Sequence, residues 1–258
     1  MAIRLRVVEP FTLKAGGGIY HRVPEPDEIF EPWGNPDLDL ERAIHGIGGF
    51  EWAITDMVEL DVQGYYKYLD QLVAPTGDER VYDNSADGYV YGAEVMLRHS
   101  FSDRFFGWIS YSLSRSMRND GAGTPDRPFD MDQRHNLVAL ASWQFARGWW
   151  LGGRFQFTSG EPYTPLRGGI FNADTGTYLP YYDEERKNER TRPPYHRFDL
   201  RLDRQWLFDT WVLHAYLDVR NVYLNANPVY TVSNYDYSEE AHVTEIPILP
   251  SIGVMAEF

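Results

Sequence analysis

Apolar and polar residues alternate along this chain in one segment after another, and this alternation restricts the fold more than any other feature. Val58, Leu60 and Val62, for example, alternate with Glu59 and Asp61. Successive side chains of a β-strand point to opposite faces, so each such segment has one apolar and one polar face. About eleven segments of this kind occur, at residues 2–8, 11–21, 42–54, 57–68, 87–100, 104–115, 135–146, 149–159, 196–206, 211–223 and 246–258.

The connections between these segments alternate in length. Short turns occur at Thr55-Asp56 and Arg147-Gly148, whereas the long loops fall at residues 22–40, 69–86, 117–133, 160–194 and 224–245. Short turns at one end and long loops at the other are typical of outer-membrane barrels. The sequence therefore predicts an all-β chain, residues 1–258 in a single domain, folded as a transmembrane antiparallel up-and-down β-barrel of about ten or eleven strands.

Charged side chains lie in the middle of the predicted strands, on their polar face. A soluble antiparallel sheet with one buried face also alternates, but mid-strand charges suit a water-filled lumen better. We expect the apolar face to meet lipid, through Leu13, Leu60, Ile109, Leu151, Leu200, Leu213 and Leu217. The predicted lumen-facing residues are Lys14, Asp61, Glu94, Arg98, Arg154, Arg201 and Asp218, with Ser112 on the same face.

Composition narrows the class of protein further. No stretch approaches the roughly 20 apolar residues of a transmembrane helix, and the net charge of −14 argues against nucleic acid as a partner. The chain contains no cysteine, so neither a disulfide nor a thiolate metal site is expected. The first residues, MAIRLRVV, include no apolar segment of the kind found in export signals, so we expect no signal peptide here.

Both ends of the predicted strands carry aromatic residues, as at the two interfaces of a membrane barrel: Trp52, Tyr66, Tyr89, Trp143, Trp149, Trp206, Trp211 and Tyr223. The last segment, from Ser251, alternates up to a terminal aromatic residue. It resembles the assembly signal of outer-membrane proteins, with Gly253 and Phe258 as its marks, but Ala256 stands where an aromatic residue is usual. The resemblance implies recognition by the barrel assembly machinery.

Several motifs occur in an order similar to that of one membrane family. They are Leu13-Lys14-Ala15-Gly16-Gly17-Gly18-Ile19-Tyr20-His21, Gly34-Asn35-Pro36-Asp37-Leu38, Gly88 to Glu94, Phe129 to Leu137, Ser159-Gly160-Glu161-Pro162-Tyr163, Phe198-Asp199-Leu200-Arg201 and Asp218-Val219-Arg220-Asn221. In this order and spacing they resemble the C-terminal half of the barrel of a TonB-dependent receptor. The resemblance spans nearly the whole chain.

That resemblance implies a location in the bacterial outer membrane and uptake of a scarce nutrient such as a metal chelate, peptide or glycan. Outer-membrane lipid and lipopolysaccharide would be partners. The family barrel has about twenty-two strands, preceded by a plug domain and a segment that contacts the energy-coupling protein. We expect this chain to contain about half of those strands and neither the plug domain nor the contacting segment. Either a partner chain would then complete the barrel, or the chain would close on itself.

For self-closure we expect a ten-stranded barrel in which the weakly patterned segment 2–8 is left out and strand 11–21 pairs with strand 246–258. One alternative function is a structural or engineered pore without a dedicated substrate. A barrel enzyme is a further alternative, since Asp132, Arg134 and His135 lie together in sequence, but no catalytic set follows from their spacing. We therefore expect no enzyme and no cofactor, and a polar network at a strand end instead.

Two loops carry residues that suggest ligands. The loop 22–39 contains six carboxylates, including Glu31, and could bind Ca²⁺, although a solvated acidic loop is the favoured interpretation. His45, His135 and His214 have no paired spacing, so no metal site is predicted. The loop 160–194 combines aromatic and basic groups that suit an anionic or glycan ligand, or lipopolysaccharide phosphates: Tyr178, Tyr181, Tyr182, Arg186 and Arg190, with Arg192 beside them in sequence.

Overall fold

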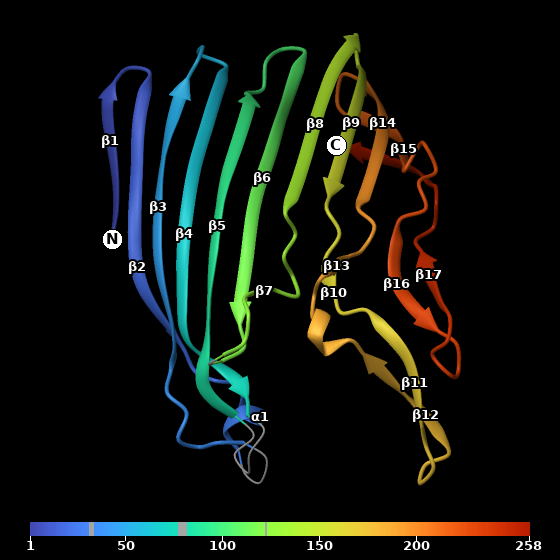
Figure 1. The fold of residues 1–258 in the computed structure, drawn as a ribbon. Coiled ribbons are helices and arrows are strands. Elements are labelled where there is room, and N and C mark those ends of the chain that lie inside the picture. Colours follow the sequence, from blue (N-terminus) through green and yellow to red (C-terminus); the bar gives the residue numbers. More distant parts are fainter. Residues whose placement is uncertain (31–33, 77–81, 122) are drawn as a thin grey trace.

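A computed structural model describes residues 1–30, 34–76, 82–121 and 123–258, and most of them belong to one curved antiparallel sheet (Figure 1). Its main path has the order β1-β2-β3-β4-β5-β6-β8-β9-β14-β15-β18. The strands are β1 (Ala2–Val8), β2 (Phe11–Arg22), β3 (Glu41–Ala53), β4 (Val58–Pro75), β5 (Tyr82–His99), β6 (Phe105–Asn119), β8 (His135–Ala146), β9 (Trp149–Thr158), β14 (Tyr195–Leu207), β15 (Val212–Arg220) and β18 (Leu249–Glu257).

The long connections carry small elements of their own. β7 (Arg127–Pro128) pairs with β6, and three separate two-stranded hairpin-like pairs follow. These are β10 (Pro162–Tyr163) with β13 (Arg190–Thr191), β11 (Leu166–Asn172) with β12 (Thr177–Tyr182), and β16 (Pro228–Ser233) with β17 (Glu240–Thr244). The described helices are the short α1 (Pro26–Ile29) and the single turn η1 (Glu184–Arg186). No helix in the described part of the chain is long and apolar enough to span a membrane.

Each of the eleven strands predicted from the alternation is present in the sheet. The largest difference is at β4 and β5, which continue into the predicted loop 69–86. Their pairing there shifts register between Leu69 and Leu72 and again between Leu72 and Ala74. These irregularities insert extra residues, so the side chains no longer alternate and the two strands cannot be recognised from a period of two.

The strand register arranges the side chains in continuous rows across the sheet. One row is entirely apolar and runs through seven strands: Leu13, Phe50, Val62, Val95, Tyr111, Leu137 and Phe157. The neighbouring row on the opposite side is small or polar: Lys14, Gly49, Gln63, Glu94, Ser112, Asn136 and Thr158. We call the side of the first row the apolar face and the side of the second row the polar face.

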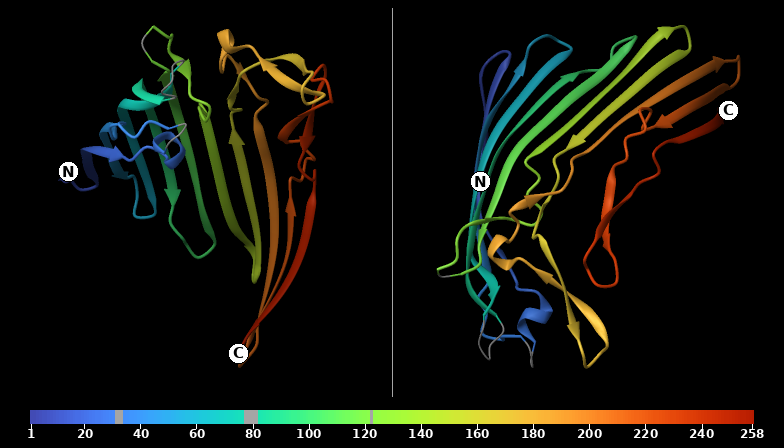
Figure 2. Two further views of the ribbon diagram at one scale, coloured as in Figure 1. Left: turned by 90° about the horizontal axis from the view of Figure 1, so that it is seen from below. Right: turned by 45° about the vertical axis from the view of Figure 1, so that its right-hand side comes forward.

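The sheet has almost no hydrophobic core of its own. Among the described residues, the buried hydrophobic side chains are Ala74 and Ala86, whereas Leu13, Ile109 and Leu151 are exposed. A soluble sheet buries its apolar face against a second layer, and no such layer covers these strands (Figure 2). An exposed face of leucine, valine and aromatic side chains therefore requires an apolar surrounding, which is what a lipid bilayer supplies.

Aromatic residues border this apolar face differently at its two ends. Tryptophan lies toward the short turns, at Trp52, Trp143, Trp149, Trp206 and Trp211. Tyrosine lies farther from the short turns, in the middle of the strands or toward the long loops, at Tyr66, Tyr68, Tyr89, Tyr91, Tyr111 and Tyr223. Tyrosine and tryptophan have an apolar ring with one polar group, so they favour the boundary between hydrocarbon and water.

The expected closure of the chain on itself is wrong. Strand β2 pairs with β1 and β3, while β18 pairs with β15, so segment 11–21 does not pair with segment 246–258. Segment 2–8, which the ten-stranded hypothesis left out, is a regular member of the sheet, with Leu5 opposite Leu13. Strands β1 and β18 are the two ends of the strand order, and in Figure 2 the N- and C-termini lie far apart at opposite sides of the gently curved sheet.

A charge placed in the middle of the apolar face should destabilise the protein in a membrane. Leu217, central in β15 and opposite Leu202 and Ile252, is the appropriate position, because Leu213 lies close to a turn. We expect Leu217→Arg to lower the free energy of unfolding by about 2–4 kcal/mol, measured by equilibrium refolding of the full protein into lipid vesicles.

The matched control is Ser112→Arg, which places the same charge on the polar face opposite Glu94. Its free energy of unfolding should change by less than about 1 kcal/mol, because an exposed ion pair has little effect on stability. Equal destabilisation by both variants would contradict the assignment of the faces.

Candidate functional site

The polar face carries a dense set of paired charges. The register places the seven charged residues predicted for the lumen on this one side, and the residues predicted for lipid on the other: Lys14, Asp61, Glu94, Arg98, Arg154, Arg201 and Asp218 against Leu13, Leu60, Ile109, Leu151, Leu200, Leu213 and Leu217. The register shows which residues share a side, whereas the contact of each side with water or lipid depends on the surroundings of the sheet. Charges on one side of six strands are nevertheless the geometry that a water-filled lumen needs.

Three of these charged residues, Lys14, Asp61 and Arg98, have an ion-pair partner on another strand. The Lys14 ammonium lies 2.6 Å from Asp61 and 3.3 Å from Glu51. Arg98 donates to Glu59 at 2.7 Å. These pairs are half-exposed, so they contribute little to stability, but they leave this face close to neutral locally.

Toward the end of the chain the polar face is rich in arginine. Arg201 donates to Asp203 at 2.8 Å and lies 3.9 Å above the Tyr216 ring. Arg154 and Asp218 line a cavity of about 400 Å³ next to Arg201. Glu94 lines another, of about 480 Å³, between β2 and β5. Four of the seven predicted lumen residues therefore lie in two separate hollows of one face rather than in a single site.

The predicted ligand loop is dispersed in the structure. Tyr178 packs against Phe171 and Tyr235, and Arg186 forms an ion pair with Glu189. Arg190 belongs to β13, Tyr181 is exposed on β12, and Tyr182 lines a cavity of about 880 Å³. The five residues do not converge on one ligand-sized space.

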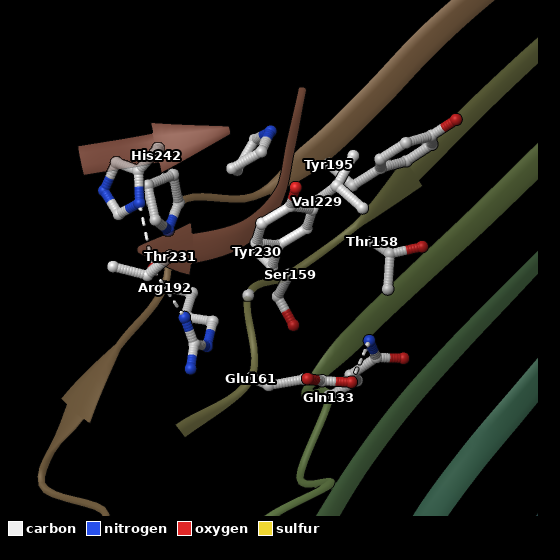
Figure 3. A pocket seen from close by; sticks show the side chains of 13 residues that line it. Gln133, Thr158, Ser159, Glu161, Arg192, Tyr195, Val229, Tyr230, Thr231 and His242 are labelled. Atoms are coloured by element: carbon white, nitrogen blue, oxygen red, sulfur yellow. Dashed lines mark hydrogen bonds between the residues drawn. The ribbon is translucent and has the colours of Figure 1, made fainter. Parts of the chain in front are cut away.

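A small cavity of about 200 Å³ lies between the end of β9, the start of β14 and the hairpin β16–β17 (Figure 3). Arg192 donates to the Thr231 hydroxyl at 3.0 Å, which lies 3.2 Å from a His242 ring nitrogen. Gln133 donates to Glu161 across the same space at 3.3 Å. The sequence had singled out Arg192 among the basic groups of loop 160–194, and Gln133 and Glu161 within motifs. Thr231 and His242 were missed, and no sequence pattern marks them.

The glycine of the Ser-Gly-x-Pro-Tyr motif has a clear steric role. A Cβ on Gly160 would lie 1.8 Å from the carbonyl oxygen of Arg192, so no other residue fits between the two loop segments. The Asp132, Arg134 and His135 cluster separates in space. Asp132 is buried and accepts from Arg115 at 2.8 Å and from the Ser116 amide at 2.7 Å, whereas His135 is hydrogen-bonded to Tyr111 at 2.8 Å.

The acidic loop 22–39 does not form a metal centre in its described part. Glu25 and Glu28 cap the start of α1, and Glu31 lies outside the described residues. In the described ranges, no three histidine, aspartate or glutamate residues are grouped closely enough to hold a metal ion. His45, His135 and His214 lie on three different strands.

Two long loops are joined by a network of charged and polar groups, which we call the loop network. Arg127 donates to both Asp120 oxygens, at 2.6 and 2.8 Å, and to Asp130 at 3.1 Å. Lys187, from the following loop, donates to Asp120 at 3.0 Å. Asn188 donates to the Pro128 carbonyl at 2.9 Å. The hydrogen bond from Arg127, supported by Lys187, holds the pKa of Asp120 below its usual range.

Comparison with known proteins assigns the fold to a family. A model of the TonB-dependent receptor-like β-barrel matches residues 2–227, so the chain belongs to the TonB-dependent receptor β-barrel family. This family is one of outer-membrane receptors and transporters. A search among curated proteins finds no match.

Solved receptors have the same fold over almost the whole chain. The ferric-catecholate import receptor Fiu from E. coli K12 has a TM-score of 0.66 at 12% identity over 99% of this chain and 34% of its own. The FrpB iron transporter from Neisseria meningitidis has a TM-score of 0.62 at 14% identity over 99% of this chain and 38% of its own. The siderophore receptor PiuA from Acinetobacter baumannii has a TM-score of 0.65 at 11% identity over 99% of this chain and 34% of its own. This chain spans about a third of the length of those receptors.

The loop network should depend on Asp120 and on pH. Asp120→Asn removes the carboxylate that Arg127 and Lys187 share, so we expect the opening free energy of loop 160–194 to fall by about 1–3 kcal/mol. Because the folded pKa of Asp120 is lowered, the stabilisation is complete above the unfolded pKa, near 3.9, and is lost as the pH falls through the folded value. Hydrogen exchange of this loop between pH 7 and pH 3 measures both effects.

Glu184→Gln is the control, because that carboxylate lies in the same loop and forms no ion pair with another described residue. Its exchange profile should match that of the unaltered protein. Exchange in Asp120→Asn that equals the control at pH 7 would show that the network does not hold the loops together.

Proposed function

We propose that this chain forms the C-terminal half of an outer-membrane TonB-dependent receptor barrel that takes up a scarce nutrient such as a metal chelate, a peptide or a glycan. The observation that carries the proposal is the sheet itself. Eleven strands share one apolar and one charged face, and the described residues supply no layer to cover either. Such a sheet is suited to lipid on one side and water on the other.

Further strands must complete the barrel. Within the described residues β1 pairs with β2 alone and β18 with β15 alone. Unpaired backbone groups in hydrocarbon cost several kcal/mol each, so both borders need partners. We propose that these are strands of the same receptor or of a partner chain. The gentle curvature of the sheet (Figure 2) favours a wide barrel over a narrow pore without a substrate.

An iron chelate is the first substrate to test. Fiu is described as a ferric-catecholate import receptor, FrpB as an iron transporter and PiuA as a siderophore receptor. At identities of 11–14% these proteins share the fold, so the substrate of this chain needs its own measurement. The apolar face would meet lipid and lipopolysaccharide in the same membrane.

Uptake of radioactive iron tests the proposal directly. The full protein is expressed in a Gram-negative host whose own iron receptors are deleted, and cells are offered iron complexed by catecholate, hydroxamate or citrate. We expect at least one chelate to enter, and uptake to be abolished in a host without the energy-coupling protein. Small peptides and oligosaccharides are the second panel.

Energy-independent leakage of all these solutes would instead support the alternative of a passive pore. If cells that carry correctly inserted barrels take up none of the chelates, peptides or sugars, the uptake function is wrong. Barrel insertion is measured separately, by the mobility change of unheated protein in gels.

Phe258 is proposed as part of an assembly signal together with Gly253. Its ring is 98% exposed and stacks on Trp211 with centroids 5.8 Å apart. Removing Phe258 should lower the yield of inserted protein in cells several-fold, while protein refolded in detergent remains unchanged. The control is Glu257→Gln, one residue away on the polar face. An unchanged yield on deletion of Phe258 would exclude the signal.

A further inference from the structure

A further hollow on the polar face contains a half-buried arginine, Arg118. It measures about 570 Å³, lies where β2 to β6 meet the long loops, and includes Tyr20, Leu69 and Phe129 in its walls. This size is ordinary for a small-molecule site. Its walls also contain charged residues of both signs: Arg22, Arg42, Arg118, Arg127, Glu28, Glu41 and Asp120.

Three of the four arginines already have a carboxylate partner, and for Arg42 it is Asp70. Arg22 donates to Glu41 at 2.5 Å, and Arg127 binds Asp120 through two nitrogen atoms within the loop network. Arg118 forms no ion pair with any residue that the structure describes. A half-buried guanidinium without a counter-ion is unusual, because desolvating a charge is costly unless an opposite charge compensates it.

The side chain of Arg118 is held in place by neutral groups. Its Nη1 donates to the Met117 carbonyl at 2.9 Å and to the Ser116 hydroxyl at 3.2 Å. The guanidinium carbon lies 4.2 Å above the centre of the Phe129 ring. On the facing strand stands Gly88, where a Cβ would lie 2.9 Å from Arg118 Cδ, so glycine leaves the room in which the arginine lies.

One edge of the guanidinium remains available. The two Nη1 bonds occupy the inner edge, whereas Nε and Nη2, which form the other edge, have no partner among the described residues. Two parallel N–H groups of this kind match the two oxygens of a carboxylate. The aromatic ring of Phe129 and the phenol of Tyr20 add apolar contact area beside them.

We propose that Arg118 binds a carboxylate of a small soluble ligand in this cavity. The cavity opens on the polar face, so a lipid headgroup, which would lie against the apolar face, is not the expected source of the anion. This inference rests on the proposed receptor function and specifies its substrate class: a solute or chelate that carries at least one free carboxylate. Neutral sugars and uncharged peptides are not expected to bind here.

The test uses titration calorimetry on the full protein in detergent micelles. Citrate is the probe, trimethyl citrate is its uncharged counterpart, and inorganic phosphate is the tetrahedral anion. We expect citrate to bind more tightly than phosphate, trimethyl citrate not to bind, and the affinity for citrate to fall as sodium chloride is added.

Variants locate the site. Arg118→Gln should weaken citrate binding at least about tenfold, and Arg118→Lys should recover only part of the loss because lysine lacks the two parallel donors. Arg98→Gln is the matched control, since Arg98 lies on the same face, at the turn end of β5, outside this cavity. It should leave the affinity unchanged.

Equal affinities in all three variants, or no citrate binding by the unaltered protein, would overturn the inference. Tighter binding of phosphate than citrate would also overturn the carboxylate assignment. The measurement needs neither a membrane nor energy coupling. A correctly inserted receptor that transports iron but ignores citrate therefore refutes this inference alone, and a citrate-binding barrel that transports nothing refutes the uptake function alone.

Discussion

The antiparallel register between neighbouring strands is the constraint on which the rest of this structure depends. Side chains repeat every two residues, so a shift of one position would turn the whole row from Leu13 to Phe157 onto the charged side. The register is specified even though almost no apolar side chain is buried within the described chain. It is specified because two different surroundings, hydrocarbon and water, each accept only one of the two faces.

The same constraint determines what the borders of the sheet require. Backbone groups of β2 to β15 find partners on both sides, while β1 and β18 have one free side each in the described residues. Hydrocarbon offers these groups no hydrogen bonds, so a closed ring of strands is the stable arrangement. The charged face adds a second condition. Lys14 pairs with Asp61 across β3, and Arg98 pairs with Glu59 on the adjacent strand, so both ion pairs need the strands in fixed register.

How far the sequence predicts this structure depends on how local each property is. The strands follow from a period of two, which nearest neighbours along the chain reveal, so all eleven were found. The parts of β4 and β5 next to the long loop were missed because bulges near Leu72 interrupt that period. Self-closure was predicted wrongly because it depends on the curvature summed over the whole sheet, which no single segment encodes. Even segment 2–8 was undervalued, although Leu5 and Leu13 face each other as the alternation requires.

The functional residues were harder to predict because they meet across long stretches of sequence. Lys187 reaches Asp120 from the next loop, and Arg192 meets Thr231 from a different hairpin, without any local pattern that marks either contact. Charge alone was misleading in the loop 160–194, where Arg186 has its own carboxylate. The distinction that matters is between an arginine with a counter-ion and one without. Arg118 belongs to the second kind, since Gly88, Phe129 and the Met117 carbonyl position it while none of them neutralises it. The carboxylate proposed as a ligand would supply the counter-ion that these neutral groups do not.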